Sequence, residues 1–216
     1  MYHFFVEPHQ IGAEEIRIEG ADVNHIRNVL RMKPGEEILI SSREGGDYFC
    51  RVEELEPEYV SAKILEEWEN KELPARIHLF QGLPKGDKME LIIQKAVELG
   101  AYRVVPVSMK RSVVKLDAKK ADAKRKRWNA VSESAAKQSK RSLIPEVAPL
   151  MTYKEAVKEA AGYDMVLLPY ESADGIRKTR ELLASVRGRI SPFSSVRRAV
   201  LRTKKSSLPG KTGRRL

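Results

Sequence analysis

The sequence predicts an α/β protein in which a small β-barrel is followed by a mostly parallel sheet with helices. Over residues 1–70, short β-like runs alternate with turns and leave room for one short helix, a pattern typical of small barrels. From residue 75 onward, strand-like runs alternate with longer helical patterns, which predicts βαβ units. The charged segment from Trp68 to Pro74 separates the two patterns and is typical of a linker.

In the first half, Asp22 is placed to cap a short helix that ends at Leu30. The sequence EGGD at residues 44–47 predicts a hairpin turn. The predicted strands are Tyr2–Val6, Ile16–Ile18, Ile38–Ser41, Tyr48–Val52 and Tyr59–Leu65.

The second half is organised around residues 77–100. A strand at Ile77–Gln81 leads into a turn rich in Gly and Pro at residues 82–86, and then into a helix. Asp87 and Glu90 have the spacing of a capping box at the start of this helix, and Gly100 suits its left-handed end. The turn is polar and cationic, and it follows the carboxyl end of a strand, where open α/β sheets bind ligands.

The remaining elements continue the α/β alternation. Thr152 and Glu155 have the spacing of a second capping box, which would begin a helix that Gly162 ends. The predicted order is a strand at Val104–Val107, a loop at Ser108–Leu116, a helix at Asp117–Ser139, the capped helix, a strand at Tyr163–Leu168 and a helix at Asp174–Ser185.

Composition excludes several classes of protein. No run of about 18 apolar residues predicts a membrane span, and the first ten residues lack the pattern of a signal peptide. The single cysteine, Cys50, excludes an internal disulfide and suits the cytoplasm. The four histidines are scattered, so no metal site is expected.

The net charge of +10 is concentrated at one end of the chain. Residues 182–216 contain ten Lys and Arg and no acid, so residues 1–181 hold 30 basic and 30 acidic side chains. A second basic run, residues 110–127, has nine Lys and Arg against two Asp. Such a run indicates either a nucleic-acid contact or a solvated helix face.

The candidate ligand residues each have a plain structural alternative. Lys85 and Lys88 flank a turn that either cradles a phosphate or only reverses the chain, and its spacing matches neither a Walker loop nor a dinucleotide fingerprint. Arg111 in the following loop either binds a phosphate or forms a surface ion pair. Residues 168–171, LPYE, end a strand at the same edge. No Ser-His-Asp or Cys-His constellation is present, and no general base is assigned.

Taken together, the motifs resemble one family, ribosomal RNA small subunit methyltransferase E, whose members methylate N3 of a uridine in 16S rRNA with S-adenosylmethionine. The resemblance covers residues 1 to about 186. It is carried by HFFV at 3–6, NHIRNVLRMKPGEEI at 24–38, QGLPKGDKMELIIQKAVELG at 81–100, KRSVVKLD at 110–117, RW at 127–128, AAKQSKR at 135–141 and LLPYE at 167–171. His3 stands where this family usually has Arg.

The resemblance implies a PUA-like RNA-binding barrel at 1–70, a linker at 71–74 and a SPOUT methyltransferase domain at 75–186, with a trefoil knot that is incomplete in this chain. It implies a cytoplasmic homodimer that acts on the small ribosomal subunit, without metal. The cofactor-binding residues would be Leu168, Pro169, Tyr170 and Glu171. The RNA-binding residues would be Arg27, Arg31, Lys33, Lys85, Lys88, Arg111, Gln138 and Arg141.

The tail, residues 187–216, departs from this family, which continues with an apolar strand, a GPEGGF cofactor loop and an acidic helix. One permitted set of codons for Phe193–Lys205, read from the last base of the Phe193 codon, encodes FIGPEGGFEDE. We therefore expect a reading-frame shift near Val186 and a basic, disordered tail. On this hypothesis the sheet keeps an open apolar edge, and the chain as written binds S-adenosylmethionine poorly, whereas the intact gene product is active. The alternatives are a catalytically inactive RNA-binding protein and a non-functional product.

Overall fold

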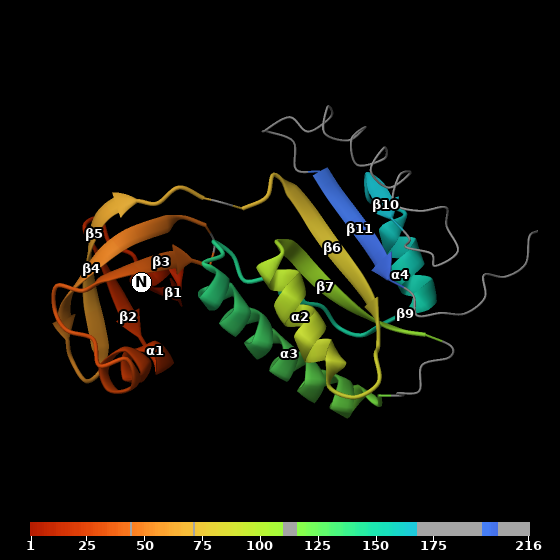
Figure 1. The fold of residues 1–216 in the computed structure, drawn as a ribbon, viewed down its shortest axis with the longest axis horizontal. Coiled ribbons are helices and arrows are strands. Elements are labelled where there is room, and N and C mark those ends of the chain that lie inside the picture. Colours follow the sequence, from red (N-terminus) through yellow and green to blue (C-terminus); the bar gives the residue numbers. More distant parts are fainter. Residues whose placement is uncertain (44, 71, 110–115, 168–195, 203–216) are drawn as a thin grey trace, which may run out of the picture.

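The computed structural model describes residues 1–43, 45–70, 72–109 and 116–167, together with the backbone of residues 196–202. Two sheets, one from each half of the chain, lie side by side and are joined by an extended segment that precedes Ala75 (Figure 1). The α/β class with a curled N-terminal barrel-like sheet and a C-terminal parallel sheet is confirmed.

The N-terminal sheet has the strand order β1-β3-β4-β5-β2. All its pairings are antiparallel except that of β1 with β3. Alternate residues of these strands point inward, and the largest fully buried side chains include Ile16, Ile18, Ile38 and Ile40. The strands are β1 Tyr2–Val6, β2 Glu15–Glu19, β3 Glu37–Ser42, β4 Asp47–Leu55 and β5 Tyr59–Glu67, with a 3-10 turn at Pro8–Gln10.

The predicted short helix of the barrel forms, but its cap differs from the prediction. Helix α1, Ala21–Asn24, continues directly into a π-helical turn at His25–Val29. Gly20 occupies the N-cap with a φ of 75°, and no side chain caps the helix. Asp22 does not cap because its carboxylate binds Lys137 Nζ instead, at 3.0 and 3.1 Å.

The C-terminal sheet has the order β10-β11-β6-β7-β8, and every pairing in it is parallel. The short strand β9 also pairs with β7. The strands are β6 Ala75–Gly82, β7 Ala101–Ser108, β8 Glu146–Val147, β9 Met151–Thr152, β10 Met165–Leu167 and β11 Val196–Arg202. The helices are α2 Lys88–Glu98, α3 Ala118–Ser139 and α4 Tyr153–Ala160.

Helices cover both faces of this sheet (Figure 1). On one face, Met89 and Ile93 of α2 and Trp128 of α3 pack with Val104 in one apolar cluster. On the other face, alanines of α4 pack against Phe80 and Val105. The predicted order of strands and helices therefore gives a layered α/β unit with two apolar interfaces.

Of the two predicted capping boxes, one forms and one does not. Asp117 accepts a hydrogen bond from the Lys120 N–H at 2.8 Å, and the capping box of Thr152 and Glu155 is complete. Asp87 occupies the N-cap of α2, but its side chain makes no capping bond. Glu90 is unavailable for the box because its carboxylate binds Arg127 of α3, at 2.8 and 3.0 Å.

The prediction of a disordered tail does not hold for Val196–Arg202, which form β11. This strand lies between β6 and β10 and pairs with both in parallel. The open edge expected on β6 is therefore covered. The physical reason is that an unpaired strand leaves a row of backbone N–H and C=O groups without partners, and β11 satisfies such groups on both neighbours. The knot and the predicted helix at 174–185 lie outside the described residues.

Side chains connect the two sheets through helix α3. Phe5 of β1 packs in the apolar cluster of α2 and α3. Arg43, which follows β3, binds Glu133 of α3 at 3.2 Å. With the pair of Lys137 and Asp22, these contacts attach the barrel to the carboxyl-terminal half of α3.

Candidate RNA and cofactor edge

The turn that follows β6 places two lysines at the carboxyl edge of the parallel sheet. The Leu83 N–H donates to the Val107 carbonyl at 3.0 Å, which holds the start of the turn against the end of β7. Gly86 then has a φ of 69°, a left-handed conformation that favours glycine. Lys85 and Lys88 are exposed on either side of it. Their ammonium groups can therefore reach a phosphate at this edge.

Gln81, at the same edge, has a buried polar atom that the sequence did not single out. Its side chain is 7% exposed, and its Nε2 donates to the Gly82 carbonyl at 2.8 Å. Its Oε1 has no hydrogen-bond partner among the described residues. A buried carbonyl oxygen is costly unless a donor pairs with it, so this oxygen fits a ligand that carries an N–H group. Position at a strand end is the signal that could have identified it.

The barrel contributes Arg27, Arg31 and Lys33 from the π-helical turn and the residues after it. Arg27 is half-buried, whereas Arg31 and Lys33 are exposed. Arg31 has a left-handed φ of 53°, and the Met32 N–H bonds to the Ile26 carbonyl at 3.1 Å, so the turn has a defined shape. Among the described residues, none of these three cations has a carboxylate partner within ion-pair distance. They remain available for phosphates.

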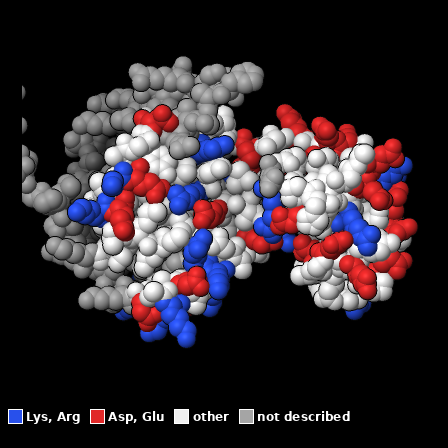
Figure 2. Space-filling view, turned by 180° about the vertical axis from the view of Figure 1, so that it is seen from behind, with Lys and Arg blue, Asp and Glu red and all other residues white. Residues whose placement is uncertain are grey.

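The rest of the barrel is acidic. Residues 1–70 contain 7 Lys and Arg against 16 Asp and Glu, a net charge of 7 − 16 = −9. Figure 2 shows acidic side chains over much of the barrel surface, and Glu53, Glu54, Glu56, Glu58, Glu66 and Glu67 of β4, β5 and the turn between them are all exposed. Because such a surface repels phosphates, only the few basic positions of the barrel are suited to contact one.

Arg141 does not lie on an RNA-facing edge, contrary to the prediction. It is 9% exposed, and its Nη1 donates to the carbonyls of Val97 and Ala101 at 2.7 and 3.1 Å. Its guanidinium also binds both carboxylate oxygens of Glu72. Arg141 therefore ties the linker to the end of α2 and the start of β7. Gln138, near the end of α3, is exposed.

His3, the departure from the family pattern, is buried at the base of the barrel. Its Nε2 contacts Ser41 Oγ at 2.8 Å, and Ser41 in turn donates to the Asp47 carboxylate. Burial lowers the pKa of His3 from 6.5 to about 4, partly opposed by the charge of Asp47 and reinforced by Lys137. His3 is thus a neutral, structural histidine near neutral pH.

The remaining predicted site residues cannot be placed. Arg111 and the four residues Leu168–Glu171 lie outside the described residues. Among the described helices, none is long and apolar enough to cross a membrane.

Comparison with known families identifies both halves of the chain. An RNA methyltransferase domain matches residues 71–194, and an RNA methyltransferase PUA domain matches residues 18–65. The Ribosomal RNA small subunit methyltransferase E of Bacillus subtilis is 37% identical over 201 residues, which are 91% of this chain and 74% of that protein. Two further relatives have the same name. The match spans 63% of the length of the one from Mycobacterium bovis and 54% of the length of the one from Synechocystis.

Solved structures give the same result. A crystal structure of a hypothetical protein has a TM-score of 0.80 and 35% identity, covering 92% of this chain and 79% of that chain. The crystal structure of the Ribosomal RNA small subunit methyltransferase E of Neisseria gonorrhoeae, bound to S-adenosyl methionine, has a TM-score of 0.70 and 28% identity. The match covers 94% of this chain and 80% of that chain. With the fold, the edge and both matched domains in agreement, the chain belongs to the ribosomal RNA small subunit methyltransferase E family.

Proposed function

We propose that the intact gene product transfers a methyl group from S-adenosylmethionine to N3 of a uridine in 16S rRNA. The observation that carries the proposal is the carboxyl edge of β6, where buried Gln81 Oε1 lacks a donor among the described residues and exposed Lys85 and Lys88 flank the following turn. Membership of the family and the bound cofactor of the Neisseria gonorrhoeae relative support the same assignment.

The cofactor fits this edge on chemical grounds. The buried Gln81 Oε1 has no donor among the described residues, and an N–H group of the cofactor could donate to it. Leu168–Glu171 would hold it, since they follow β10, which ends at Leu167 on the same edge. When bound, S-adenosylmethionine supplies an electrophilic methyl group on a sulfonium.

The residues of the chain position the nucleophile. Lys85 and Lys88 would neutralise phosphates that flank the target, and Arg27, Arg31 and Lys33 of the barrel would hold phosphates farther along the RNA. A uridine must leave its base stack for N3 to reach the methyl group. N3 must lose its proton, which would pass to solvent, before it can displace the sulfur from the methyl carbon, and cations near the base would favour this deprotonated form.

For the 216-residue chain itself we propose RNA binding with little cofactor binding. Its sequence lacks the GPEGGF loop that the family resemblance implies, and the strand that lies between β10 and β6 has the sequence VRRAVLR. The acid-free segment from residue 182 adds positive charge. We also propose that the intact protein acts as a homodimer, which equilibrium sedimentation would test.

The decisive assay measures labelled methyl incorporation into 16S rRNA within small subunits that lack this modification. A form of the protein whose reading frame is restored near residue 186 is expected to be active. A double variant, Lys85→Gln with Lys88→Gln, is expected to lose most incorporation, whereas Lys63→Gln, an exposed lysine of β5, keeps it. Incorporation by the double variant equal to that of Lys63→Gln would reject the assignment of this edge.

A further inference from the structure

A cleft of about 470 Å³ lies at the amino-terminal end of the parallel sheet, opposite the edge that carries Lys85. It is lined by Arg76 and His78 of β6, Tyr102 and Arg103 of β7, and Glu159, Gly162 and Tyr163 at the end of α4. Its volume falls within the range of small-ligand sites. Because β6 and β7 are parallel, their first residues lie at the end of the sheet away from the turn that carries Lys85.

A β-bulge turns two consecutive side chains into this cleft. Ile77 pairs with Ala101, and the next residue, His78, pairs with Arg103, so Tyr102 is the extra residue on β7. In a regular strand, neighbouring residues point to opposite faces. The bulge removes this restriction, and both Tyr102 and Arg103 line the same cleft.

The cleft presents aromatic faces around a cation. The Arg76 guanidinium lies over the Tyr102 ring, 4.8 Å from its centroid. The His78 ring centroid is 5.4 Å from that of Tyr102 and 4.7 Å from that of Tyr163. Such surfaces bind planar bases by stacking.

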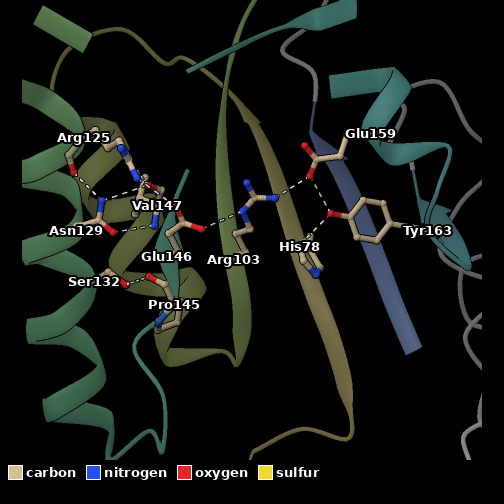
Figure 3. Close-up of polar contacts among 10 residues, drawn as sticks. All are labelled: His78, Arg103, Arg125, Asn129, Ser132, Pro145, Glu146, Val147, Glu159 and Tyr163. Atoms are coloured by element: carbon tan, nitrogen blue, oxygen red, sulfur yellow. Dashed lines mark hydrogen bonds and ion pairs between the residues drawn. The ribbon is translucent and has the colours of Figure 1, made fainter. Parts of the chain in front are cut away.

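The inner wall of the cleft is held by a polar network that crosses the sheet (Figure 3). Arg103 Nη1 binds Glu159 at 2.8 Å, and the Tyr163 hydroxyl donates to the same carboxylate oxygen at 3.0 Å. His78 Nδ1 contacts that hydroxyl at 3.1 Å. Arg103 also pairs with Glu146 at 3.4 Å. Glu159 is therefore neutralised within the wall.

Of the two arginines that line the cleft, Arg103 is paired with carboxylates, whereas Arg76 differs. Arg76 is exposed, and none of the described carboxylates lies within ion-pair distance of it. A guanidinium in this position binds phosphate with two parallel hydrogen bonds. A ligand that offers both a planar base and a phosphate matches the two features together.

We propose that this cleft is a nucleotide-binding site, in which Tyr102 stacks with the base and Arg76 binds the phosphate. The ligand is a nucleoside monophosphate unit, either free or within single-stranded RNA. The site lies at the end of the sheet opposite the methyl-transfer edge and does not depend on methyltransferase activity.

The test titrates the full 216-residue chain by calorimetry with uridine monophosphate, adenosine monophosphate, uridine, ribose 5-phosphate and a six-nucleotide uridine RNA. We expect the two mononucleotides to bind with a Kd of about 0.1 mM, and uridine and ribose 5-phosphate at least tenfold more weakly. If the hexanucleotide binds at least tenfold more tightly than uridine monophosphate, and Arg76→Gln removes this advantage while Lys85→Gln keeps it, RNA is the source. Equal affinity identifies the free nucleotide.

Variants locate the binding. Arg76→Gln and Tyr102→Leu should each weaken mononucleotide binding by about fivefold to tenfold, and Tyr102→Phe should retain it because the ring remains. The matched control is Arg17→Gln, since Arg17 lies over the Tyr59 ring in the barrel at 3.9 Å and does not line this cleft. Far-ultraviolet circular dichroism verifies the fold of each variant.

The proposal is overturned if neither mononucleotide shows saturable binding up to about 5 mM. It is also overturned if Arg17→Gln weakens binding as much as Arg76→Gln, or if Tyr102→Leu leaves affinity unchanged.

Discussion

Arg141 donates a hydrogen bond through Nε to Glu72 Oε1 at 2.7 Å, and a second guanidinium nitrogen binds the other carboxylate oxygen. The pair joins the linker before β6 to the residue after the last turn of α3. Its two side chains are only 10% and 15% exposed, so it lies in a medium that screens charges poorly. The linker after the barrel is therefore attached to the C-terminal half of the chain by a nearly buried ion pair.

Removing one partner of this pair should destabilise the fold. Glu72→Gln leaves the Arg141 charge buried without its counter-ion, and we expect a loss of about 3 kcal/mol in the free energy of unfolding. Urea denaturation measures this loss. Glu37→Gln, which breaks the exposed pair with Arg51, is the control and should cost about 0.5 kcal/mol or less. Equal losses in the two variants would contradict a structural role for Arg141.

The buried His3 predicts a dependence of stability on pH. Its pKa is about 4 in the folded protein against 6.5 in the unfolded chain, so between these values the unfolded chain binds more protons. The free energy of unfolding should fall as pH decreases from about 6.5 to 4, by on the order of 3 kcal/mol from this group. His3→Gln should flatten this part of the profile, while His9→Gln, at an exposed position, should not. An unchanged slope in His3→Gln would refute the effect.

Cys50 should report on unfolding of the barrel. It is buried in β4, and burial raises the pKa of its thiol to about 12, which leaves little of the reactive thiolate at neutral pH. A thiol reagent such as dithionitrobenzoate should modify the native chain at least about 100-fold more slowly than the urea-unfolded chain. Rapid modification of the native chain would show that β4 is not packed as described.

The exposed lysines at the carboxyl edge should contribute to RNA affinity through charge. Lys85→Ala and Lys88→Ala should each weaken binding to a 16S rRNA fragment and reduce the slope of log affinity against log salt by about 1. Fluorescence anisotropy over a range of salt concentrations measures this slope. Lys63→Ala, on the acidic sheet of the barrel, is the control and should leave it unchanged. If the slope stays constant in both lysine variants, Lys85 and Lys88 do not contact RNA phosphates.

Local patterns in the sequence predicted the elements that depend on local chemistry. Strand β1 and helix α3 match their predicted bounds to within a residue, because a run of strand-forming residues and a long helical pattern are visible in the chain. The capping box of Thr152 and Glu155 forms, and no ion pair competes for Glu155 within the described part of the chain. Glu90 had the same spacing but binds Arg127, which lies 37 residues later, and no local pattern shows such a partner.

The site was harder to predict because burial decides which polar residues are available. Arg141 looks like a surface cation in a basic run, but its partners are carbonyls and a carboxylate from distant segments. Gln81 looks like an ordinary strand residue until its burial is known. Tyr102 and Arg103 converge only because of a bulge in the register of β7, which no spacing in the sequence reveals.

Methyl transfer with and without the restored reading frame tests the account most directly. Both forms of the protein are incubated with labelled S-adenosylmethionine and small subunits that lack the modification, and label at uridine N3 is measured. We predict incorporation by the frame-restored protein and at least a 100-fold lower rate for the 216-residue chain. The lower rate is expected because an altered cofactor site no longer holds the methyl group in a reactive position beside N3. Equal incorporation by both forms, or none by the restored protein, would contradict the account.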